Sequence, residues 1–528
     1  MRFLLIIIFS TSILSVFANE YNVMAYGAKG DGNTIETQAI QNAVDACHKT
    51  GGIVVFPAGK YLTGTIYLKS NVTLYLQKGA IILGSTKMAD YPENLPEYTF
   101  YRSGKIKRAL IYAENCENIG ISGEGTIDGQ GNMIYKANGE AVKSYGERPH
   151  VIWMVQSKRI RINGIKLQNS SLWMQHYLAC ENLHIHNIEV YNHCNKNNDM
   201  IDINGCKNVI ISDCRGDTDD DGITIKSTHA KPNENILINN CIISSHCNAI
   251  KCGTESNTGF KNIVISNCII RPSQKRDVIY GKPDGISGIS LEVVDGAKMD
   301  GISISNIVID GPRVPLFIRL GNRARGYDKN LPKPQIGSIE NITVSNITAF
   351  NADITGSSIT GIPGHMVKNI SLENIRIFYK GGGTFEDANR LIPENESDYP
   401  EATMFDKLSV YGLFIRHAQN ISLKDVEFHL QSNDKRPALY LENVENVKII
   451  NLQAGIDTNT SLIYGKDIKD IFIQNPRPKS QCLSSINIHG NQSESIRLTD
   501  IHTKYFKTIY KISGGANKKS VMLGTLFK

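Results

Sequence analysis

The chain of 528 residues lacks a long apolar run after its first 18 residues and lacks a large excess of charge. The formal net charge is only +6, and no basic stripe of the kind that binds nucleic acid is apparent. Residues 1–18 have the composition of a secretory signal, with Arg2 before an apolar stretch and Ala18 at its end. We therefore expect a secreted or periplasmic protein with no membrane span and no nucleic-acid partner.

Cys-x-x-Cys pairs are also missing, although the chain contains 11 cysteines. Such pairs are typical of metal and redox sites, so neither is indicated. Cys214, Cys241 and Cys268 instead recur every 27 residues. The spacing predicts a column of small buried side chains in a coiled fold.

What the sequence does contain is a repeat of 23–27 residues, in which a short alternating strand is followed by a polar residue and a second short strand. Asn tolerates the left-handed backbone of a sharp corner, and stacked Asn side chains can hydrogen-bond from one turn of the repeat to the next. The polar position is occupied in order by Gly164, Asn187, Asp213, Asn240 and Asn267, and less regularly by Asn306, Asn346, Asn374 and Asp425.

This period predicts an all-β chain folded as one parallel β-helix, a solenoid that forms a single domain over residues 19–528. Helical periodicity is clear only over residues 37–49, where a helix could cover the open end of the coil. Beyond residue 325 the repeats lie farther apart, and we expect long loops at 322–336 and 380–406 to line a groove or cap an end.

A cluster of carboxylates interrupts the repeat. Asp199 ends an Asn-Asn-Asp run, and Asp219, Asp220 and Asp221 follow 20 to 22 residues later, slightly less than one coil. These side chains can therefore meet on neighbouring coils. Hydrolysis of a glycosidic bond needs one protonated acid and one carboxylate that activates water, and this arrangement can supply both. An acidic turn or a calcium site is the alternative. His246 follows one coil later.

Several segments resemble the polygalacturonase family of glycoside hydrolases, family 28, whose members are right-handed β-helices. The opening segments 26–33, 37–41, 51–52 and 56–61, and the later segment 123–129, are similar to that family and its β-helix relatives. More specifically, the family's Asn-Thr-Asp appears as Asn-Asn-Asp at 197–199, and its Gly-Asp-Asp-Cys and Ile-x-Ile-Lys-Ser appear at 219–227.

The resemblance implies a role for each acid. Asp220 would protonate the leaving oxygen, while Asp199 and Asp221 would hold and deprotonate the attacking water, with inversion and without a metal ion or another cofactor. His246 would help to tune or orient the acid, although its sequence context differs from the family's Gly-His-Gly.

The chain departs from the family at one motif. The family's Arg-Ile-Lys, which binds the substrate carboxylate, is absent from residues 288–295, where it is expected. Another cationic clamp is then expected, since arginine can bind a carboxylate through two parallel hydrogen bonds. The candidates are Lys226, Lys251, Arg319 and Arg323. Trp173 and His176 precede Asp199 by about one coil and could face a sugar ring.

We therefore predict a monomeric glycoside hydrolase that cleaves α-galacturonosidic bonds in acidic plant polysaccharide (pectin). The altered clamp and the long loops favour a branched substrate or release of single residues from chain ends. Two alternatives remain open. One is a pectate-lyase-type enzyme that eliminates with calcium, and the other is a β-helix that binds carbohydrate without catalysis.

Overall fold

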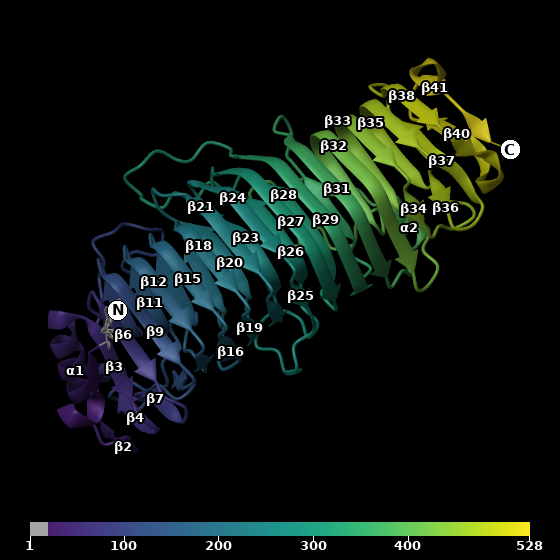
Figure 1. Cartoon of the computed structure of the whole chain (residues 1–528). Coiled ribbons are helices and arrows are strands. Elements are labelled where there is room, and N and C mark those ends of the chain that lie inside the picture. Colours follow the sequence, from purple (N-terminus) through teal and green to yellow (C-terminus); the bar gives the residue numbers. More distant parts are fainter. Residues whose placement is uncertain (1–18, 528) are drawn as a thin grey trace, which may run out of the picture.

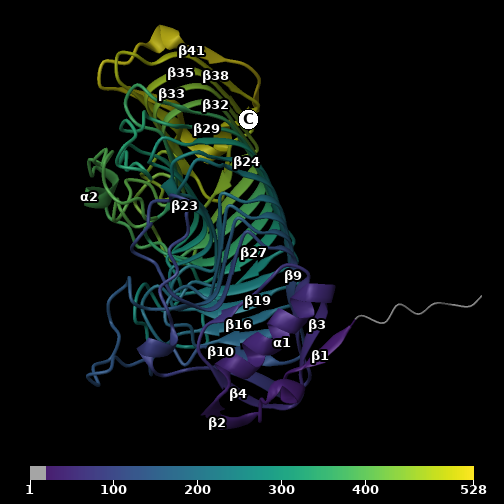
Figure 2. The ribbon, with the colours of Figure 1, turned by 90° about the vertical axis from the view of Figure 1, so that its left-hand side faces the viewer.

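The computed structural model describes residues 19–527 and shows one continuous coil of parallel strands, in which β1 (Glu20–Asn22) and β41 (Val521–Leu523) lie at opposite ends of the coil (Figure 1 and Figure 2). The predicted signal at 1–18 lies outside the described residues. Each turn of the coil contributes a strand to each of up to three sheets, and every strand pairs in parallel with its counterpart one turn later. The predicted all-β parallel β-helix is confirmed. No helix within 19–527 is long and apolar enough to cross a membrane.

The first sheet, here called the site sheet, is buried on both of its faces in the middle of the coil, as in β17, β20 and β23. Its strands, in order of pairing, are β5 (Ile66–Tyr67), β8 (Ala109–Glu114), β11 (His150–Val155), β14 (Gln175–Leu178), β17 (Ile201–Asn204), β20 (Ile223–Ser227), β23 (Asn248–Ser256), β26 (Ser287–Val293), β28 (Val314–Leu320), β30 (Ser357–Thr360), β32 (Leu413–Leu430), β33 (Leu439–Ile450), β35 (Ile463–Gln474), β37 (Cys482–His489) and β40 (Phe506–Ser513).

The second sheet, here called the ladder sheet, has alternating burial, with Ile and Val inward and polar residues outward. It contains β1 (Glu20–Asn22), β3 (Gly52–Phe56), β6 (Val72–Leu76), β9 (Glu117–Gly123), β12 (Lys158–Asn163), β15 (Glu181–His186), β18 (Lys207–Ser212), β21 (Asn233–Asn239), β24 (Gly259–Ser266), β27 (Lys298–Asp310), β29 (Ser338–Ala352), β31 (Val367–Tyr379), parts of β32, β33 and β35, then β38 (Glu494–Thr499) and β41 (Val521–Leu523).

The third sheet closes the coil. It contains β2 (Asp31–Ile35), β4 (Gly59–Thr63), β7 (Ala80–Gly84), β10 (Thr126–Asp128), β13 (Lys166–Gln168), β16 (Glu189–Asn192), β19 (Arg215–Thr218), β22 (Ile242–Ser245), β25 (Ile269–Ile270), the later parts of β27, β29, β31 and β32, then β34 (Gln453–Ala454) and β36 (Arg477–Pro478). A separate pair, β39 (Ile501–His502) and β42 (Leu526–Phe527), lies near the C-terminus.

The corners of the coil are built from the predicted polar column. Each member has a positive φ, for example 51° at Asn187, 58° at Asp213 and 56° at Asn240. The side chains also bond along the column, since Asn306 Nδ2 donates to Asn267 Oδ1 over 3.1 Å. The predicted role of asparagine as corner and ladder is therefore confirmed.

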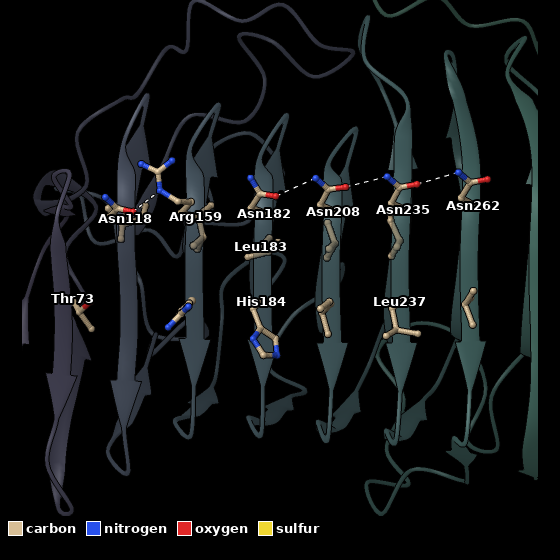
Figure 3. A pocket seen from close by; sticks show the side chains of 17 residues that line it. Thr73, Asn118, Arg159, Asn182, Leu183, His184, Asn208, Asn235, Leu237 and Asn262 are labelled. Atoms are coloured by element: carbon tan, nitrogen blue, oxygen red, sulfur yellow. Dashed lines mark hydrogen bonds between the residues drawn. The ribbon is translucent and has the colours of Figure 1, made fainter.

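A second asparagine ladder runs over the surface groove of the ladder sheet (Figure 3). Asn208 donates to Asn182 over 3.1 Å, and Asn235 and Asn262 each donate to the preceding member over 3.0 Å. These residues also have φ near 55–58°. Side-chain hydrogen bonds thus supplement the backbone ladder between coils.

Helix α1 (Thr37–Thr50) confirms the predicted helix and extends it by one residue. It packs against β1, β3, β5 and β6 at the N-terminal end of the coil (Figure 2). Ile40, Val44 and Cys47 are fully buried on its inner face. The helix therefore covers apolar side chains and strand edges that the first coil would otherwise expose to solvent.

All 11 cysteines are free thiols, and Cys214, Cys241 and Cys268 are buried one coil apart as predicted. The only other α-helix among residues 19–527 is the short α2 (Phe385–Ala388). It lies within the second of the long loops predicted from the sequence, between β31 and β32. Ala402, Phe405 and Leu408, which lie between β31 and β32, pack with Phe317 and Phe414 of the site sheet. Phe100 and Ile106, from the loop between β7 and β8, pack with Trp153 and Leu178 in the same way. Loop side chains therefore bury the outer face of the site sheet.

Candidate active site

Strand register brings the predicted acids together. Ile201 of β17 pairs with Ile223 of β20, so Asp199 and Asp221, each two residues earlier, occupy equivalent positions on neighbouring coils. Ile223 pairs in turn with Ile250, which places Asn248 at the same position one coil later. Asp220 precedes this column by one residue.

The acids line a single cavity of about 240 Å³ on the outer face of the site sheet. Its walls come from strands and from loops distant in the sequence, so the predicted loops do line a groove. The lining residues are Arg102, Tyr145, Trp173, Asn197, Asp199, Asp220, Asp221, Lys226, Lys251, Thr254, Glu255, Tyr280, Arg325, Tyr399 and Glu401.

Asp220 has the environment of a proton donor. Burial and the neighbouring charge of Asp221 raise the pKa of its carboxyl to about 6. One of its carboxylate oxygens lies within 4.8 Å of one of Asp221. Oδ2 accepts a hydrogen bond from Asn197 Nδ2 over 3.4 Å, so the side chain stays oriented. A carboxyl with this pKa remains protonated in mildly acidic solution.

Asp221 is held as an acceptor. Lys251 Nζ lies 3.3 Å from its Oδ2 atom, and Asn248 donates to its Oδ1 atom from the side-chain nitrogen over 2.7 Å. Burial alone would lower the pKa of Lys251, but Asp221 and Glu292 raise it well above its usual range. The ammonium is therefore charged and forms an ion pair with the carboxyl of Asp221.

Asp199 belongs to a second charged group that includes a carboxylate missed in the sequence, Asp202. Lys226 Nζ lies 3.1 Å from Asp202 Oδ1 and 3.6 Å from Asp199 Oδ2. Burial raises the pKa of Asp202 to about 7, while burial and the charge of Asp202 raise the pKa of Asp199 well above its usual range. Two buried carboxyls beside one ammonium thus retain a proton near neutral pH.

Two of the four predicted clamp residues, Lys226 and Lys251, line the cavity. The structure corrects the expectation for Arg319, which lies in β28, two coils beyond the strand that carries Lys251. Its guanidinium is buried and donates to the carbonyls of Gly361 and Asn395 over 3.2 Å. Arg323 lies beneath the cavity wall, where it pairs with Asp295 over 3.1 and 2.5 Å.

Arg102 and Arg325 supply the cationic side of the cavity, and neither was predicted. Arg102 reaches in from the loop between β7 and β8 and lies 3.0 Å from Glu255. Arg325 comes from the loop after β28, and its Nη2 atom lies 3.5 Å from the same carboxylate. Burial alone would raise the pKa of Glu255, but Lys226, Arg102 and Arg325 lower it, so Glu255 stays ionised.

The two predicted stacking residues have different positions. Trp173 lines the cavity, and the Lys226 ammonium lies 4.5 Å from the centre of its ring. His176 is fully buried behind it, stacked on Trp153 with ring centres 6.1 Å apart. Burial lowers the pKa of His176 well below its usual value, so it is a neutral packing residue that does not line the cavity.

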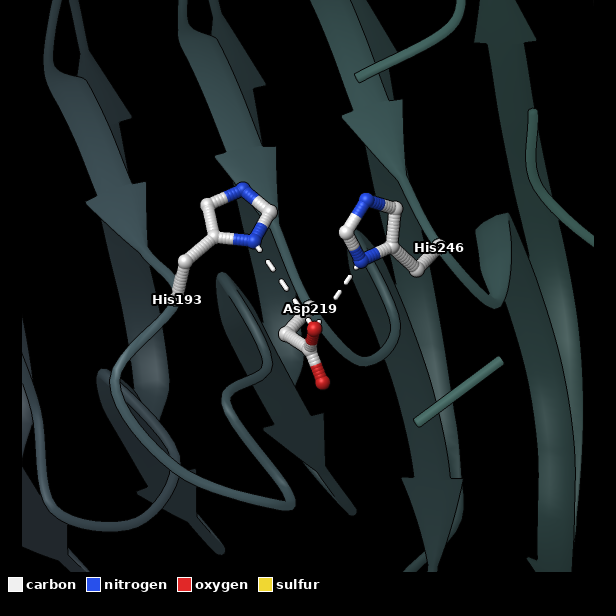
Figure 4. Close-up of side chains that lie close together, drawn as sticks. All are labelled: His193, Asp219 and His246. Carbon is white, nitrogen blue, oxygen red and sulfur yellow. Dashed lines mark hydrogen bonds and ion pairs between the residues drawn. The ribbon is translucent and has the colours of Figure 1, made fainter. Parts of the chain in front are cut away.

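His246 was expected to act on the acids, but it lies outside the cavity lining and bonds to Asp219 instead (Figure 4). Its Nδ1 atom is 2.9 Å from Asp219 Oδ1. The residue that touches Asp221 from this coil is Asn248. The one-coil spacing correctly predicted that His246 lies beside the aspartates at 219–221. Its partner, however, is Asp219, which does not line the cavity.

Comparisons with known proteins agree with this geometry. The model of glycosyl hydrolases family 28 matches residues 48–394. A probable polygalacturonase of Vitis vinifera is 28% identical over 388 residues, which cover 69% of this chain and 76% of that protein. An exo-poly-alpha-D-galacturonosidase of Dickeya chrysanthemi is 37% identical over 155 residues, 28% of this chain and 25% of that protein.

Among solved structures, an exopolygalacturonase from Thermotoga maritima is 21% identical, covers 78% of this chain and 92% of its own, and has a TM-score of 0.59. A polygalacturonase from Erwinia carotovora is 20% identical over 68% of this chain and 93% of its own, with a TM-score of 0.53. Both likenesses concern the right-handed β-helix fold. With the family match spanning well over half of its length, the chain belongs to glycosyl hydrolases family 28 and is a glycoside hydrolase.

Proposed function

We propose that this enzyme hydrolyses α-linked galacturonic acid in pectic polysaccharide. The observation that carries the proposal is one cavity that holds the protonatable Asp220, the neighbouring Asp221 and cationic side chains. The named activities of the Vitis and Dickeya relatives support the same substrate class. A negatively charged sugar suits a cavity lined by Arg102, Lys226, Lys251 and Arg325.

In the reaction we propose, Asp220 donates its proton to the glycosidic oxygen as the bond from that oxygen to the anomeric carbon breaks. A water molecule forms the new bond to the anomeric carbon from the opposite face and releases a proton to a carboxylate. The configuration at the anomeric carbon is therefore inverted. The pKa of about 6 at Asp220 suits an acid that must be protonated in the resting enzyme.

Asp221 and Asp199 hold the attacking water in this scheme. Asp221 is paired with the Lys251 ammonium, and its carboxyl oxygens can accept a hydrogen bond from the water. Asp199 has a raised pKa, which makes it the stronger base once its proton is lost to solvent or shared with Asp202. Lys226 stabilises the negative charge that remains on the Asp199 and Asp202 pair.

We further propose that the enzyme releases single residues from chain ends. The volume of about 240 Å³ is below the ~300–1,000 Å³ typical of sites for drug-sized ligands, so it fits one sugar better than a long polymer segment. Residues from separate loops, among them Arg102, Tyr280 and Tyr399, wall the cavity. The region 1–18 is proposed to direct export to the polysaccharide, and the enzyme is proposed to act as a monomer.

A reducing-sugar screen over polygalacturonate, rhamnogalacturonan and xylogalacturonan tests the proposal, with products separated by size. We expect galacturonic acid monomer from the start of the reaction and no product with a double bond. An ultraviolet-absorbing product whose formation stops with a chelator would identify a lyase. Binding of these polymers without any new reducing end would identify a non-catalytic protein.

A further inference from the structure

Next to the catalytic cavity lies a second buried cluster, formed by His193, Asp219 and His246 (Figure 4). Asn192, Thr218 and Ser245 pair in register on β16, β19 and β22, and each cluster member is the next residue along the chain. Three successive coils thus stack two imidazoles around one carboxylate. Their side chains are 2%, 0% and 0% exposed.

The geometry of these groups matches what a metal ion needs. One nitrogen of each histidine and one oxygen of Asp219 lie within 4.8 Å of one another. His246 Nδ1 is 2.9 Å and His193 Nδ1 is 3.9 Å from Asp219 Oδ1. These distances bracket the separation of about 3.4 Å expected for two ligands that each lie about 2.1 Å from a tetrahedral ion.

The outer ring nitrogens are already occupied by acceptors. His246 Nε2 lies 2.7 Å from the carbonyl oxygen of Lys275, which can only accept, so this nitrogen carries a proton. His193 Nε2 lies 2.8 Å from Asp217 Oδ1 in the same arrangement. Metal-binding histidines characteristically donate their second ring N–H to a carboxylate or a carbonyl in this way.

The inner nitrogens are then left facing a carboxylate. A neutral imidazole would direct a lone pair from Nδ1 toward the negative charge of Asp219, so a cation is needed between them. His193 Nδ1 is buried and has no hydrogen-bond partner within residues 19–527. The available cations are a proton on an imidazole ring or a bound metal ion.

We propose that His193, Asp219 and His246 form a site for a divalent transition-metal ion such as Zn²⁺, which fastens the loop 271–286 to the coil. Two imidazole nitrogens and one carboxylate oxygen suit this class of ion. Asp219 also accepts hydrogen bonds from the backbone of Ile279 and Tyr280 over 2.9 and 2.8 Å. The ion fixes this loop, and with it the wall residue Tyr280 and the neighbour Asp220, and takes no part in breaking the glycosidic bond.

The decisive experiment measures metal retained by the full-length protein. The protein is stripped with a chelator, incubated with Zn²⁺, desalted and analysed for metal. We expect about one equivalent in the wild type and in His186→Gln, a control at a histidine whose side chain is 43% exposed and lies 3.2 Å from Asp213. His193→Gln should retain less than a tenth of that. The proposal is overturned if the wild type retains no stoichiometric Zn²⁺, or if His193→Gln retains as much Zn²⁺ as the wild type. In either case the cation in the cluster is a proton.

Trypsin provides a second readout that does not depend on activity. Arg276 is exposed in the loop that the ion is proposed to fasten. Zn²⁺ should slow cleavage after Arg276 at least several-fold in the wild type and leave the rate unchanged in His193→Gln. Equal rates with and without Zn²⁺ in the wild type would contradict the fastening role. The comparison of the wild type with and without Zn²⁺ does not depend on the variant, so it tests the proposal even if His193→Gln misfolds.

Discussion

The ammonium nitrogen of Lys226 lies 3.1 Å from Oδ1 of Asp202, and both side chains are almost completely buried. Asp202 pairs in register with His176 on one side and Thr224 on the other. It is fully buried and does not line the cavity. The charge of Lys226 is therefore partly neutralised by a residue that never meets the substrate. Arg102 and Arg325 are also paired, with Glu255, but their side chains are 24% and 30% exposed against 7% for Lys226, so they are the more accessible partners for a sugar carboxylate.

Substituting Asp202→Asn should move the acid side of the pH–activity profile to lower pH. Burial and Asp202 raise the pKa of Asp199, which must be ionised to act as a base. Removing the charge of Asp202 lowers that pKa, so activity should persist to a pH lower by about one unit. The profile of kcat/KM against pH measures the shift.

Glu401→Gln is the matched control, because it removes another cavity carboxyl whose pKa is raised to about 7 by burial. It should leave the acid limb in place, since Lys251, Glu292 and Asp221 are the charges that act on Glu401. An acid limb that does not move in Asp202→Asn would remove Asp199 from the role of base.

Substituting Asp220→Asn should lower kcat on the correct substrate by about 10²-fold or more, which is the usual contribution of a general acid. In the wild type, kcat/KM should fall as the pH rises through about 6, because the pKa of Asp220 is raised to that value and the acid must be protonated. This alkaline limb should disappear in the variant. Steady-state rates across the pH range measure both effects.

Asp213→Asn controls for the change of an aspartate to an asparagine elsewhere on the coil. Asp213 has a φ of 58° at a corner, where asparagine is equally suitable. Its kinetics should equal those of the wild type. An Asp220→Asn enzyme that keeps the wild-type rate would show that another group donates the proton.

Arg325→Gln should weaken the action on polygalacturonate by about 10- to 100-fold in kcat/KM, which is the range for losing a hydrogen bond to a charged group. The effect should be much smaller on the methyl-esterified polymer, because the ester has no carboxylate for the guanidinium to bind. The ratio of the two kcat/KM values is the measurement.

Arg313→Gln removes an arginine that is 39% exposed and should change neither rate. If Arg325→Gln lowers both rates equally, the arginine maintains the shape of the cavity and does not recognise the sugar carboxylate.

The fold and the acidic cluster were predictable because both depend on the repeat. Once the corner residues such as Asn187 and Asp213 fix the length of each coil, the relative positions of Asp199 and Asp221 follow from counting. Asp202 could have been found by the same reasoning, because it alternates with Ile201 and Ile203 and so points out of the coil toward the acids. The period of the repeat therefore predicts which residues on neighbouring strands lie side by side.

The loop residues could not be predicted in this way. Arg102 and Tyr399 come from segments outside the period, so the sequence gives no register that would bring either one to the cavity. Arg319 shows a different error, because it does lie on a strand of the site sheet, but on one that is two coils beyond the strand of Lys251. At about 4.8 Å per coil, the two coils between the strands of Lys251 and Arg319 amount to about 10 Å.

The asparagine ladder of the ladder sheet should contribute measurably to stability at each position. In Asn208→Ala, an alanine would have to adopt a φ of 57°, at a cost of about 1–2 kcal/mol. The substitution also removes the hydrogen bonds with Asn182 and Asn235, each worth about 0.5–1.5 kcal/mol in general. We expect Asn208→Ala to unfold at a lower urea concentration than the wild type.

Two control variants separate the backbone effect from the side-chain effect. Asn208→Gly should be the milder change, because glycine tolerates the positive φ. Lys207→Ala removes only a surface ion pair with Glu234 and should have almost no effect on the unfolding midpoint. Equal unfolding midpoints for all three variants would show that neither the corner conformation nor the side-chain ladder stabilises the coil.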